Sequence, residues 1–193
     1  MRGVLQANLQ QVDWSALPKP DDDGAARHLT GLRVPDHALQ ATSGGAVNLS
    51  ALAGRTVLYI YPMTGQPGVA LPDGWDEIPG ARGCTPQSCA FRDHYADLLQ
   101  AGAARVFGLS SQACADQREA AGRLHLPFAL LSDADLAFAR ALALPAFSLQ
   151  HRVLLKRMAL VIDEAVITKV FYPAFPPDQN AANVLAWLKD NPI

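Results

Sequence analysis

The chain has 193 residues, half of them hydrophobic, and its 16 basic and 18 acidic side chains leave a net charge of −2. This length suits one α/β domain with its own core, and a near-neutral chain without a basic stripe lacks the electrostatic footprint of a nucleic-acid-binding protein. No apolar run approaches the roughly 18 residues of a membrane span, and the first residues lack the apolar core of a secretory signal, so we expect a cytoplasmic location and neither a membrane nor a nucleic acid as partner.

Residues 1–31 are expected to form an N-terminal extension to a domain that covers 32–193. The run 18–24 holds two prolines and three aspartates before a glycine, which is typical of a turn or linker. Trp14 and Leu17 lie in this extension and are expected to pack on the surface of the domain.

The first strong strand signal is the run 56–61, Thr-Val-Leu-Tyr-Ile-Tyr. Its side chains are β-branched or aromatic and apolar on both faces, as in a central strand of a covered sheet. Pro62 ends this strand. The stretch 65–80 then contains four glycines and three prolines, which predicts a long irregular loop. A loop of this length inside a compact domain usually has a function.

A helix is predicted next, over 84–101, because Phe91, Tyr95 and Leu98 recur on one face and Gly102 can end it. The remaining predicted elements are a strand at 105–109, a helix at 112–124, a strand at 127–131, a helix at 133–142, strands at 158–162 and 166–172 that form a hairpin, and a helix at 180–189 with Asp178 as its N-cap. This order predicts an α/β fold of the thioredoxin-like class, with a central mixed β-sheet flanked by helices.

Three cysteines are too few for a disulfide framework, and two of them stand close together in the sequence, at positions 84 and 89. Cys84 begins the predicted helix, after a glycine-rich approach at 80–83 that lets backbone amides face the sulfur. Pro86 suits the first turn of that helix. The positive end of a helix stabilises a thiolate, which is the nucleophilic form of cysteine. This position favours a reactive cysteine over a buried structural one.

On one helix, Cys84 and Cys89 are separated by about 500° of rotation and about 7.5 Å of rise. Their Cα atoms are then too far apart for a disulfide, so the helix must unwind locally before the pair can close. A metal site is the alternative, but His94 is the only candidate for a further ligand close in the sequence, and a structural zinc site needs four ligands. The pair therefore favours redox chemistry without a metal.

The segment 83–93 reads Gly-Cys-Thr-Pro-Gln-Ser-Cys-Ala-Phe-Arg-Asp, and it resembles the peroxiredoxin Q, or bacterioferritin comigratory protein, branch of the peroxiredoxins. The resemblance extends over roughly residues 31–190. It includes the motifs at 33–36, 49–54, 61–62, 107–110 and 127–133, and Arg157 six positions before Asp163.

The resemblance implies a thiol-dependent peroxidase, a peroxiredoxin of the atypical two-cysteine kind. Cys84 would attack hydrogen peroxide or an organic hydroperoxide and become a sulfenic acid. Cys89 would resolve this acid as an intramolecular disulfide, which a thioredoxin-type dithiol reduces. Arg157 would hold the thiolate and polarise the peroxide. No organic or metal cofactor is implied, and we expect a monomer or a weak homodimer.

The chain departs from the family pattern ahead of the reactive cysteine. Pro62 lies 22 positions before Cys84 where the family has seven, an insertion of 15 residues. The family places a threonine three positions before the cysteine, where this chain has Ala81. Thr64 can supply the missing hydroxyl if the insertion loops out and returns, and Thr85 is the alternative donor. The candidate peroxide-binding residues are therefore Thr64, Pro62, Thr85 and Gly83.

Two other functions fit the same residues. A thioredoxin-like disulfide oxidoreductase would use the same pair, although such enzymes place two residues between their cysteines and this chain places four. A non-enzymatic redox sensor would use the disulfide as a switch. Cys114 is expected to pack or to lie on the surface. The 65–80 loop is expected to cover the cysteine site, with Trp75 or Ile78 as an apolar lid.

Overall fold

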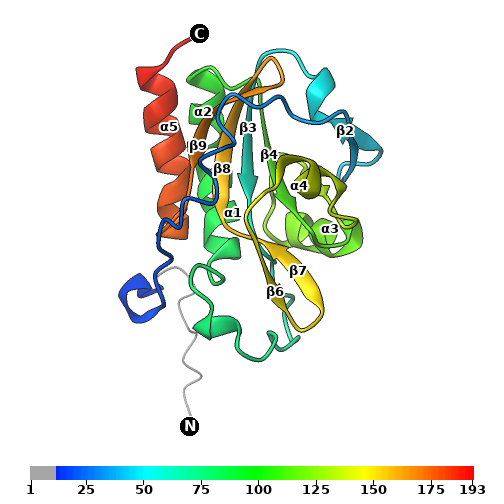
Figure 1. The fold of residues 1–193 in the computed structure, drawn as a ribbon, viewed down its shortest axis with the longest axis vertical. Helices are drawn as coiled ribbons and strands as arrows, with labels where there is room; N and C mark the ends of the chain where they lie inside the picture. Colours follow the sequence, from blue (N-terminus) through cyan, green and yellow to red (C-terminus); the bar gives the residue numbers. More distant parts are fainter. Residues whose placement is uncertain (1–11) are drawn as a thin grey trace.

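The computed structural model describes residues 12–193, so the expectation for the first 11 residues of the N-terminal extension lies outside the described part. The main sheet has seven strands in the order β2-β1-β5-β4-β3-β8-β9. They are β1 (Ala38–Ala41), β2 (Ala46–Asn48), β3 (Arg55–Ile60), β4 (Arg105–Ser110), β5 (Leu130–Ser132), β8 (Met158–Asp163) and β9 (Val166–Phe171). β4 pairs in parallel with β3 and β5, whereas the other neighbours are antiparallel. The predicted α/β fold with a central mixed sheet is confirmed (Figure 1).

Helices cover both faces of this sheet (Figure 1). They are α1 (Cys84–Asp93), α2 (Tyr95–Gln100), α3 (Cys114–Arg123), α4 (Ala137–Leu142) and α5 (Asn180–Asp190). Tyr59 of β3 packs with Phe91 of α1 and Leu185 of α5 in one core. Its neighbour Leu58 packs with Phe138 of α4 in the other core. Because successive side chains of a strand point to opposite faces, β3 is buried on both sides, as its sequence predicts.

Gly108 of β4 leaves the space that the Tyr59 ring occupies. A Cβ at Gly108 would lie 2.6 Å from that ring and 2.5 Å from Leu130, so any side chain here would displace the tyrosine. The Tyr59 ring is instead free to stack on Phe91, with ring centroids 4.4 Å apart. This stack packs α1 against the sheet.

The predicted helix 84–101 is two helices in the structure. α1 ends at Asp93, His94 departs from helical geometry, and α2 begins at Tyr95. The apolar residues of both helices still face the same core. The hydrophobic pattern therefore carries no sign of the break.

The predicted helix 133–142 begins only at Ala137. The carboxylate of Asp133 accepts the backbone N–H groups of Phe138 and Ala139, at 3.0 and 2.8 Å. These are amides that a helix leaves unpaired at its start. Asp133 thus precedes α4 and stabilises its first turn. The other boundaries shift less: the helix predicted at 112–124 is α3, and the strand predicted at 127–131 is β5.

The hairpin predicted at 158–162 and 166–172 is confirmed as β8 and β9. A second hairpin, β6 (Ala146–Leu149) with β7 (Arg152–Leu155), is not predicted by the sequence. Its turn residues Gln150 and His151 have φ values of 47° and 62°. Glycine and asparagine are the usual signal for such a turn, and neither is present.

Residues 12–24, which we call the strap, lie against the C-terminal segment that precedes α5. They begin with a short 3-10 turn (Trp14–Ala16), and another 3-10 turn (Pro177–Gln179) leads into α5. The Trp14 indole N–H donates to the Asp178 carboxylate at 2.9 Å, and the indole packs edge-on against Phe175. The prediction that Asp178 caps α5 is therefore wrong, because this carboxylate binds the strap and no side chain caps the helix.

The other end of the strap is bound through Asp23. Its carboxylate accepts hydrogen bonds from Lys156 at 2.7 Å and from the Tyr172 hydroxyl at 2.8 Å. Just beyond the strap, Ala26 and Leu29 are buried in the core beside α4. The described part of the extension is therefore packed on the domain, and its boundary at residue 31 stays a prediction.

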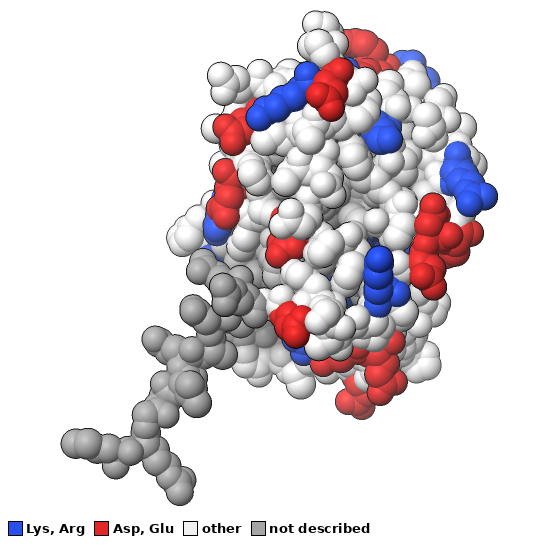
Figure 2. All heavy atoms as spheres, turned by 90° about the vertical axis from the view of Figure 1, so that its left-hand side faces the viewer, with Lys and Arg blue, Asp and Glu red and all other residues white. Residues whose placement is uncertain are grey.

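In the described chain, no helix has the length and apolar character that crossing a membrane requires. On the face that Figure 2 shows, basic and acidic side chains are interspersed rather than gathered by sign.

Candidate active site

Cys84 occupies the first position of α1, and only 4% of it is exposed. Gly83 precedes it with a φ of 108°, a left-handed conformation that glycine adopts readily. A Cβ at Gly83 would come within 2.4 Å of Pro177, so a larger residue would also push the C-terminal segment away. The Cys84 sulfur thus lies at the positive end of α1, where the first amides have no partner within the helix.

Arg157 lies in the two-residue link between β7 and β8, and only 3% of it is exposed. Its Nη2 atom donates to the Cys84 sulfur at 3.2 Å. The same nitrogen contacts the carbonyl oxygens of Gly80, Ala81 and Arg82 at 3.3, 3.0 and 3.1 Å. The approach to the cysteine therefore holds the guanidinium with its carbonyls. An amide cradle for the peroxide, expected from 80–83, stays a prediction.

The surroundings of Arg157 favour an anionic sulfur. Within residues 12–193, no carboxylate forms an ion pair with this guanidinium. A buried charge without a counter-ion is strongly unfavourable. The Cys84 thiolate is the group in contact that can supply the negative charge. The guanidinium and the start of α1 therefore stabilise the thiolate together.

Gln87 and Asn180 position the guanidinium, and neither is among the residues predicted from the sequence. Arg157 Nη1 donates to the side-chain oxygen of Gln87. Gln87 in turn donates to the side-chain oxygen of Asn180 at 2.9 Å, and both amides are buried. The sequence signal that could have identified Gln87 is that it is a polar residue one turn after Cys84, on the inward face of the helix. Asn180 gives no local signal, because it is 93 positions away from its partner.

Two tyrosines lie beneath α1 on the sheet. The Tyr59 hydroxyl donates to Ser88 at 3.1 Å, and the Tyr61 ring stacks beside Tyr59 at 5.8 Å. Burial raises the pKa of Tyr59 and that of Tyr61 well above the ordinary value. Both phenols therefore remain neutral at physiological pH. The Tyr59 hydroxyl supports α1 through Ser88, whereas the Tyr61 hydroxyl accepts a hydrogen bond from Gln117 of α3 at 3.3 Å.

Cys89 lies on the same helix and is half-buried, and Cys84, Cys89 and Cys114 are all free thiols. On a regular helix the first two sulfurs point about 140° apart. Burial raises the pKa of the Cys89 thiol, and the nearby Arg92 opposes this effect. The structure thus describes the reduced form, in which the predicted pair shares a helix without bonding. Cys114 begins α3, with a guanidinium nitrogen of Arg118 3.7 Å from its sulfur.

Of the four candidate peroxide-binding residues, two line the cavity that Cys84 lines and two do not. Gly83 and Thr85 line the same cavity as the sulfur. The Thr64 hydroxyl instead donates to the side-chain oxygen of Gln112 at 3.2 Å, and its backbone N–H donates to the same oxygen at 2.8 Å. Pro62 is buried just after β3. Thr85 is therefore the hydroxyl that shares the cavity with the sulfur.

A cavity of about 420 Å³ opens onto Cys84, and we call it the trough. Its walls come from the start of the strap, the 65–80 loop, the approach to Cys84 and one residue of α3. Its large apolar side chains, prolines aside, are Val12, Trp14, Met63, Val69, Leu71 and Trp75. The loop therefore borders the cysteine cavity, and the role of Trp75 or Ile78 as a lid stays a prediction. Trp75 is 4% exposed and packs in a small core with Met63 and Ala81, against which Ile78 also packs.

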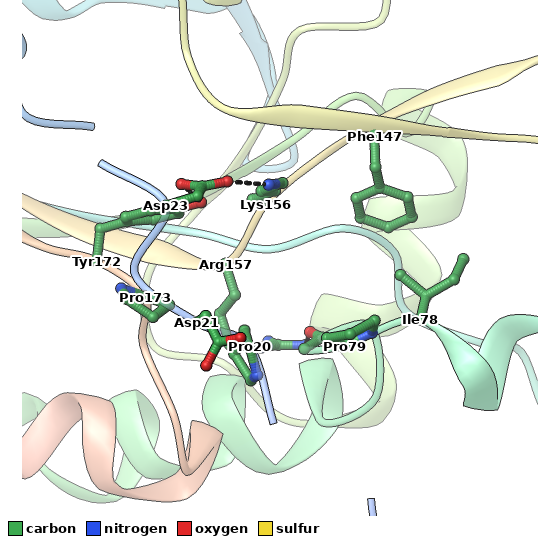
Figure 3. A pocket seen from close by; sticks show the side chains of 11 residues that line it. Pro20, Asp21, Asp23, Ile78, Pro79, Phe147, Lys156, Arg157, Tyr172 and Pro173 are labelled. Carbon is green, nitrogen blue, oxygen red and sulfur yellow. Dashed lines mark hydrogen bonds and ion pairs between the residues drawn. The ribbon is translucent and has the colours of Figure 1, made fainter. Parts of the chain in front are cut away.

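A second cavity, of about 330 Å³, borders Arg157 (Figure 3). Figure 3 shows Arg157 among Pro20 of the strap and Pro79 of the 65–80 loop, with the Asp23–Lys156 ion pair close by. The strap and the loop thus meet around the arginine that contacts the Cys84 sulfur.

One group of described residues brings three possible metal ligands together. Ligand atoms of His37, Asp133 and Asp135 lie within 4.8 Å of one another near the start of α4. Both carboxylate oxygens of Asp133 already accept amides of that helix. The carboxylate of Asp135 accepts a further hydrogen bond, from the Ala137 amide at 3.0 Å, so both aspartates of this group have a structural role in capping α4.

Comparison with known proteins identifies the family. The redoxin family model matches residues 29–185, which is most of the chain. A chloroplastic peroxiredoxin Q of Sedum lineare is 31% identical over 166 residues, which cover 85% of this chain and 80% of that protein. The chain belongs to the redoxin family, in its peroxiredoxin Q branch. The resemblance stated from the segment 83–93 is thereby confirmed.

Two further relatives show how much of each protein the similarity covers. The chloroplastic peroxiredoxin Q of japonica rice is 33% identical to this redoxin over 161 residues, and the match spans 82% of the chain but only 66% of the rice protein. The crystal structure of the peroxidoxin BcpB of Mycobacterium tuberculosis superposes with a TM-score of 0.68 at 27% identity, covering 85% of this chain and 98% of that one. The thioredoxin-like fold of the domain is confirmed.

Proposed function

We propose that this redoxin is a thiol-dependent peroxidase that reduces hydrogen peroxide and organic hydroperoxides through Cys84. The observation that carries the proposal is the 3.2 Å contact between Arg157 Nη2 and the Cys84 sulfur at the start of α1. A guanidinium and a helix N-terminus together favour the thiolate, which is the form that attacks a peroxide. Membership of a family whose relatives are named peroxiredoxins supports the same activity.

In the first step, the Cys84 thiolate attacks the terminal oxygen of the hydroperoxide and the O–O bond breaks. The other oxygen takes a proton and leaves as an alcohol, or as water when the substrate is hydrogen peroxide, and Cys84 becomes a sulfenic acid. The Arg157 donor stabilises the charge that develops on the leaving oxygen. Gln87 and Asn180 keep this donor in place, and Thr85 is the proposed hydroxyl that orients the peroxide.

In the second step, the sulfur of Cys89 attacks the sulfenic sulfur of Cys84 as a thiolate. A disulfide forms and the hydroxyl leaves as water. A thioredoxin-type dithiol is the proposed reductant, and it restores both thiols while its own pair is oxidised. Because burial raises the pKa of Cys89, its exposure to solvent favours this step.

Location and assembly remain predictions from the sequence. The plant relatives are named chloroplastic, and that word describes those proteins. A cytoplasmic monomer or weak homodimer is proposed for this chain on its composition and on its intramolecular cysteine pair.

The proposal is tested by peroxide consumption with thioredoxin, thioredoxin reductase and NADPH. We expect turnover by the wild type, none by Cys84→Ser, strongly reduced turnover by Cys89→Ser, and normal turnover by the matched control Cys114→Ser. Full activity of Cys84→Ser would refute the proposal. Rapid reduction of insulin without peroxide turnover would indicate a disulfide oxidoreductase, and a disulfide that forms once without turnover would indicate a sensor.

A further inference from the structure

The trough that leads to Cys84 is more apolar than a small, polar substrate such as hydrogen peroxide requires. Trp14 and Trp75 contribute aromatic surface to it, and Met63 contributes a flexible apolar side chain. Contact with an apolar surface adds little to the binding free energy of hydrogen peroxide, because this molecule has no hydrocarbon part to remove from water.

The 65–80 loop is held in place by polar contacts at both ends and supplies three of the six large apolar side chains of the trough wall, Val69, Leu71 and Trp75. Near its start, the carbonyl of Gly65 accepts a hydrogen bond from Arg123 at 3.0 Å. Near its end, Asp76 forms a bidentate ion pair with Arg82. Trp75 is buried between these points. These contacts hold the loop in one conformation, so it forms a fixed side of the trough.

Two apolar side chains of this wall remain exposed beside the reactive cysteine. Val69 is 61% exposed and Leu71 is 37% exposed, and both line the trough. Exposed apolar side chains that border a reactive site are a common mark of a ligand-binding surface. A hydrocarbon group bound in the trough would cover them.

The charged groups of the trough are already paired. Arg82 is paired with Asp76, and Arg123 with Glu119 at 2.8 Å. Each guanidinium already has a carboxylate partner, so pairing with either one adds little to the binding free energy of an anionic substrate. The trough thus favours an uncharged group over a fatty-acid carboxylate.

We infer that the trough selects hydroperoxides that carry a bulky, uncharged alkyl or aryl group, with Val69 and Leu71 as specificity-determining residues. This inference rests on the proposed peroxidase function. The hydrocarbon part lies along the loop while the O–OH group reaches the sulfur. The thiolate takes the terminal oxygen, and the bulky group leaves as its alcohol after taking a proton.

The test is a single-turnover measurement on the pre-reduced full-length protein, which needs no reductase. The rate constant for loss of the Cys84 thiol is measured with cumene hydroperoxide and with hydrogen peroxide, and the ratio of the two is compared among variants. We expect a ratio above one for the wild type. In the double variant Val69→Ser, Leu71→Ser, this ratio should fall about tenfold, the usual scale for losing apolar contacts in a specificity pocket.

Leu99→Ser is the matched control, because Leu99 lies on α2 with an exposure of 36%, nearly that of Leu71. Its ratio should equal that of the wild type. The inference is overturned if the wild-type ratio is at or below one, or if the double variant has the same ratio as the wild type. The proposed peroxidase function stands in either case. A Cys84 thiol that reacts with neither peroxide overturns the proposed function itself.

Discussion

The Cys84 sulfur and the Arg157 guanidinium form the smallest unit that explains the proposed chemistry. Three backbone carbonyls and the Gln87 side chain hold the guanidinium in contact with the sulfur before any substrate binds. A donor fixed in this way stabilises developing charge without having to reorganise. The geometry of the arginine therefore matters as much as its charge.

Replacing Arg157 tests this point. In Arg157→Ala, the single-turnover rate constant with hydrogen peroxide should fall by about 100-fold or more, the usual effect of removing a donor that stabilises a transition state. Arg157→Lys should recover part of the rate, because an ammonium keeps the charge but lacks the planar fork of donors. Thermal unfolding of each variant serves as the control for folding. A rate for Arg157→Ala within threefold of the wild type would contradict the role.

The motif around Cys84 makes it and Cys89 candidates from the sequence, and the resemblance adds Arg157, which the structure places in contact with Cys84. The residues that orient the arginine were not predictable, because they come from distant parts of the chain. Gln87 contacts Arg157 across 70 positions, and Asn180 contacts Gln87 across 93. Such contacts arise from tertiary packing and leave no local pattern in the sequence.

Helix α1 must change shape during the proposed cycle. Its start is held by Gly83 against Pro177 and by the Gln87 contact with Arg157, and its middle by Ser88 on Tyr59. These contacts favour the reduced, helical form. Opening the first turns has a low cost in backbone hydrogen bonds, because the amides at a helix start lack partners within the helix.

Hydrogen exchange tests this opening. In the oxidised protein, amides of residues 85–92 should exchange faster than in the reduced protein, because closing the disulfide requires the helix to unwind there. Amides of β3 and β8 should exchange at the same rate in both forms and serve as the internal control. Equal protection of 85–92 in both forms would contradict a mechanism that depends on local unwinding.

Strong local patterns, continuous or periodic, account for the elements that were predicted. β3 and β8 are continuous apolar runs, and the structure buries them on both faces. The β6–β7 hairpin was missed because its turn residues, Gln150 and His151, adopt positive φ without the residues that usually signal such a turn. The break at His94 was missed because it leaves the apolar face of the two helices aligned.

The strap, the 65–80 loop and the C-terminal segment converge on the cysteine end of the sheet, as the lower part of Figure 1 shows. A Cβ at Gly80 would lie 3.3 Å from Pro20, and one at Gly83 would lie 3.0 Å from Trp14. The length of the insertion could be read from the spacing of Pro62 and Cys84. Its place near Cys84 could also be predicted, but the packing of Trp75 with Met63 and Ala81 could not, because those residues come together only through tertiary packing.

Asp23 provides a test of the strap that depends on pH. Its hydrogen bond with Lys156 holds the pKa of Asp23 well below the ordinary value. Its contribution to stability is therefore complete above the unfolded-state pKa of about 3.9 and is lost as the pH falls toward the folded-state pKa. We expect Asp23→Asn to have a lower Tm than the wild type at pH 7 and a shrinking difference below pH ~4. The gap should be small, because the ion pair is partly exposed.

Asp21→Asn removes the same charge two positions away and is the matched control, with an expected Tm close to that of the wild type. Equal Tm values for Asp23→Asn and the wild type at pH 7 would contradict the attachment. So would a difference that grows on acidification.

The most direct measurement is mass spectrometry of the reduced full-length protein after one equivalent of hydrogen peroxide. Part of the sample is quenched early with a sulfenic-acid trap, and the rest is digested without reduction. We expect the trap on Cys84 at early times, then a peptide that joins Cys84 to Cys89 within one chain. A trap on Cys89 or Cys114, or a disulfide that joins Cys84 to Cys114 or to a second chain, would contradict the proposed mechanism.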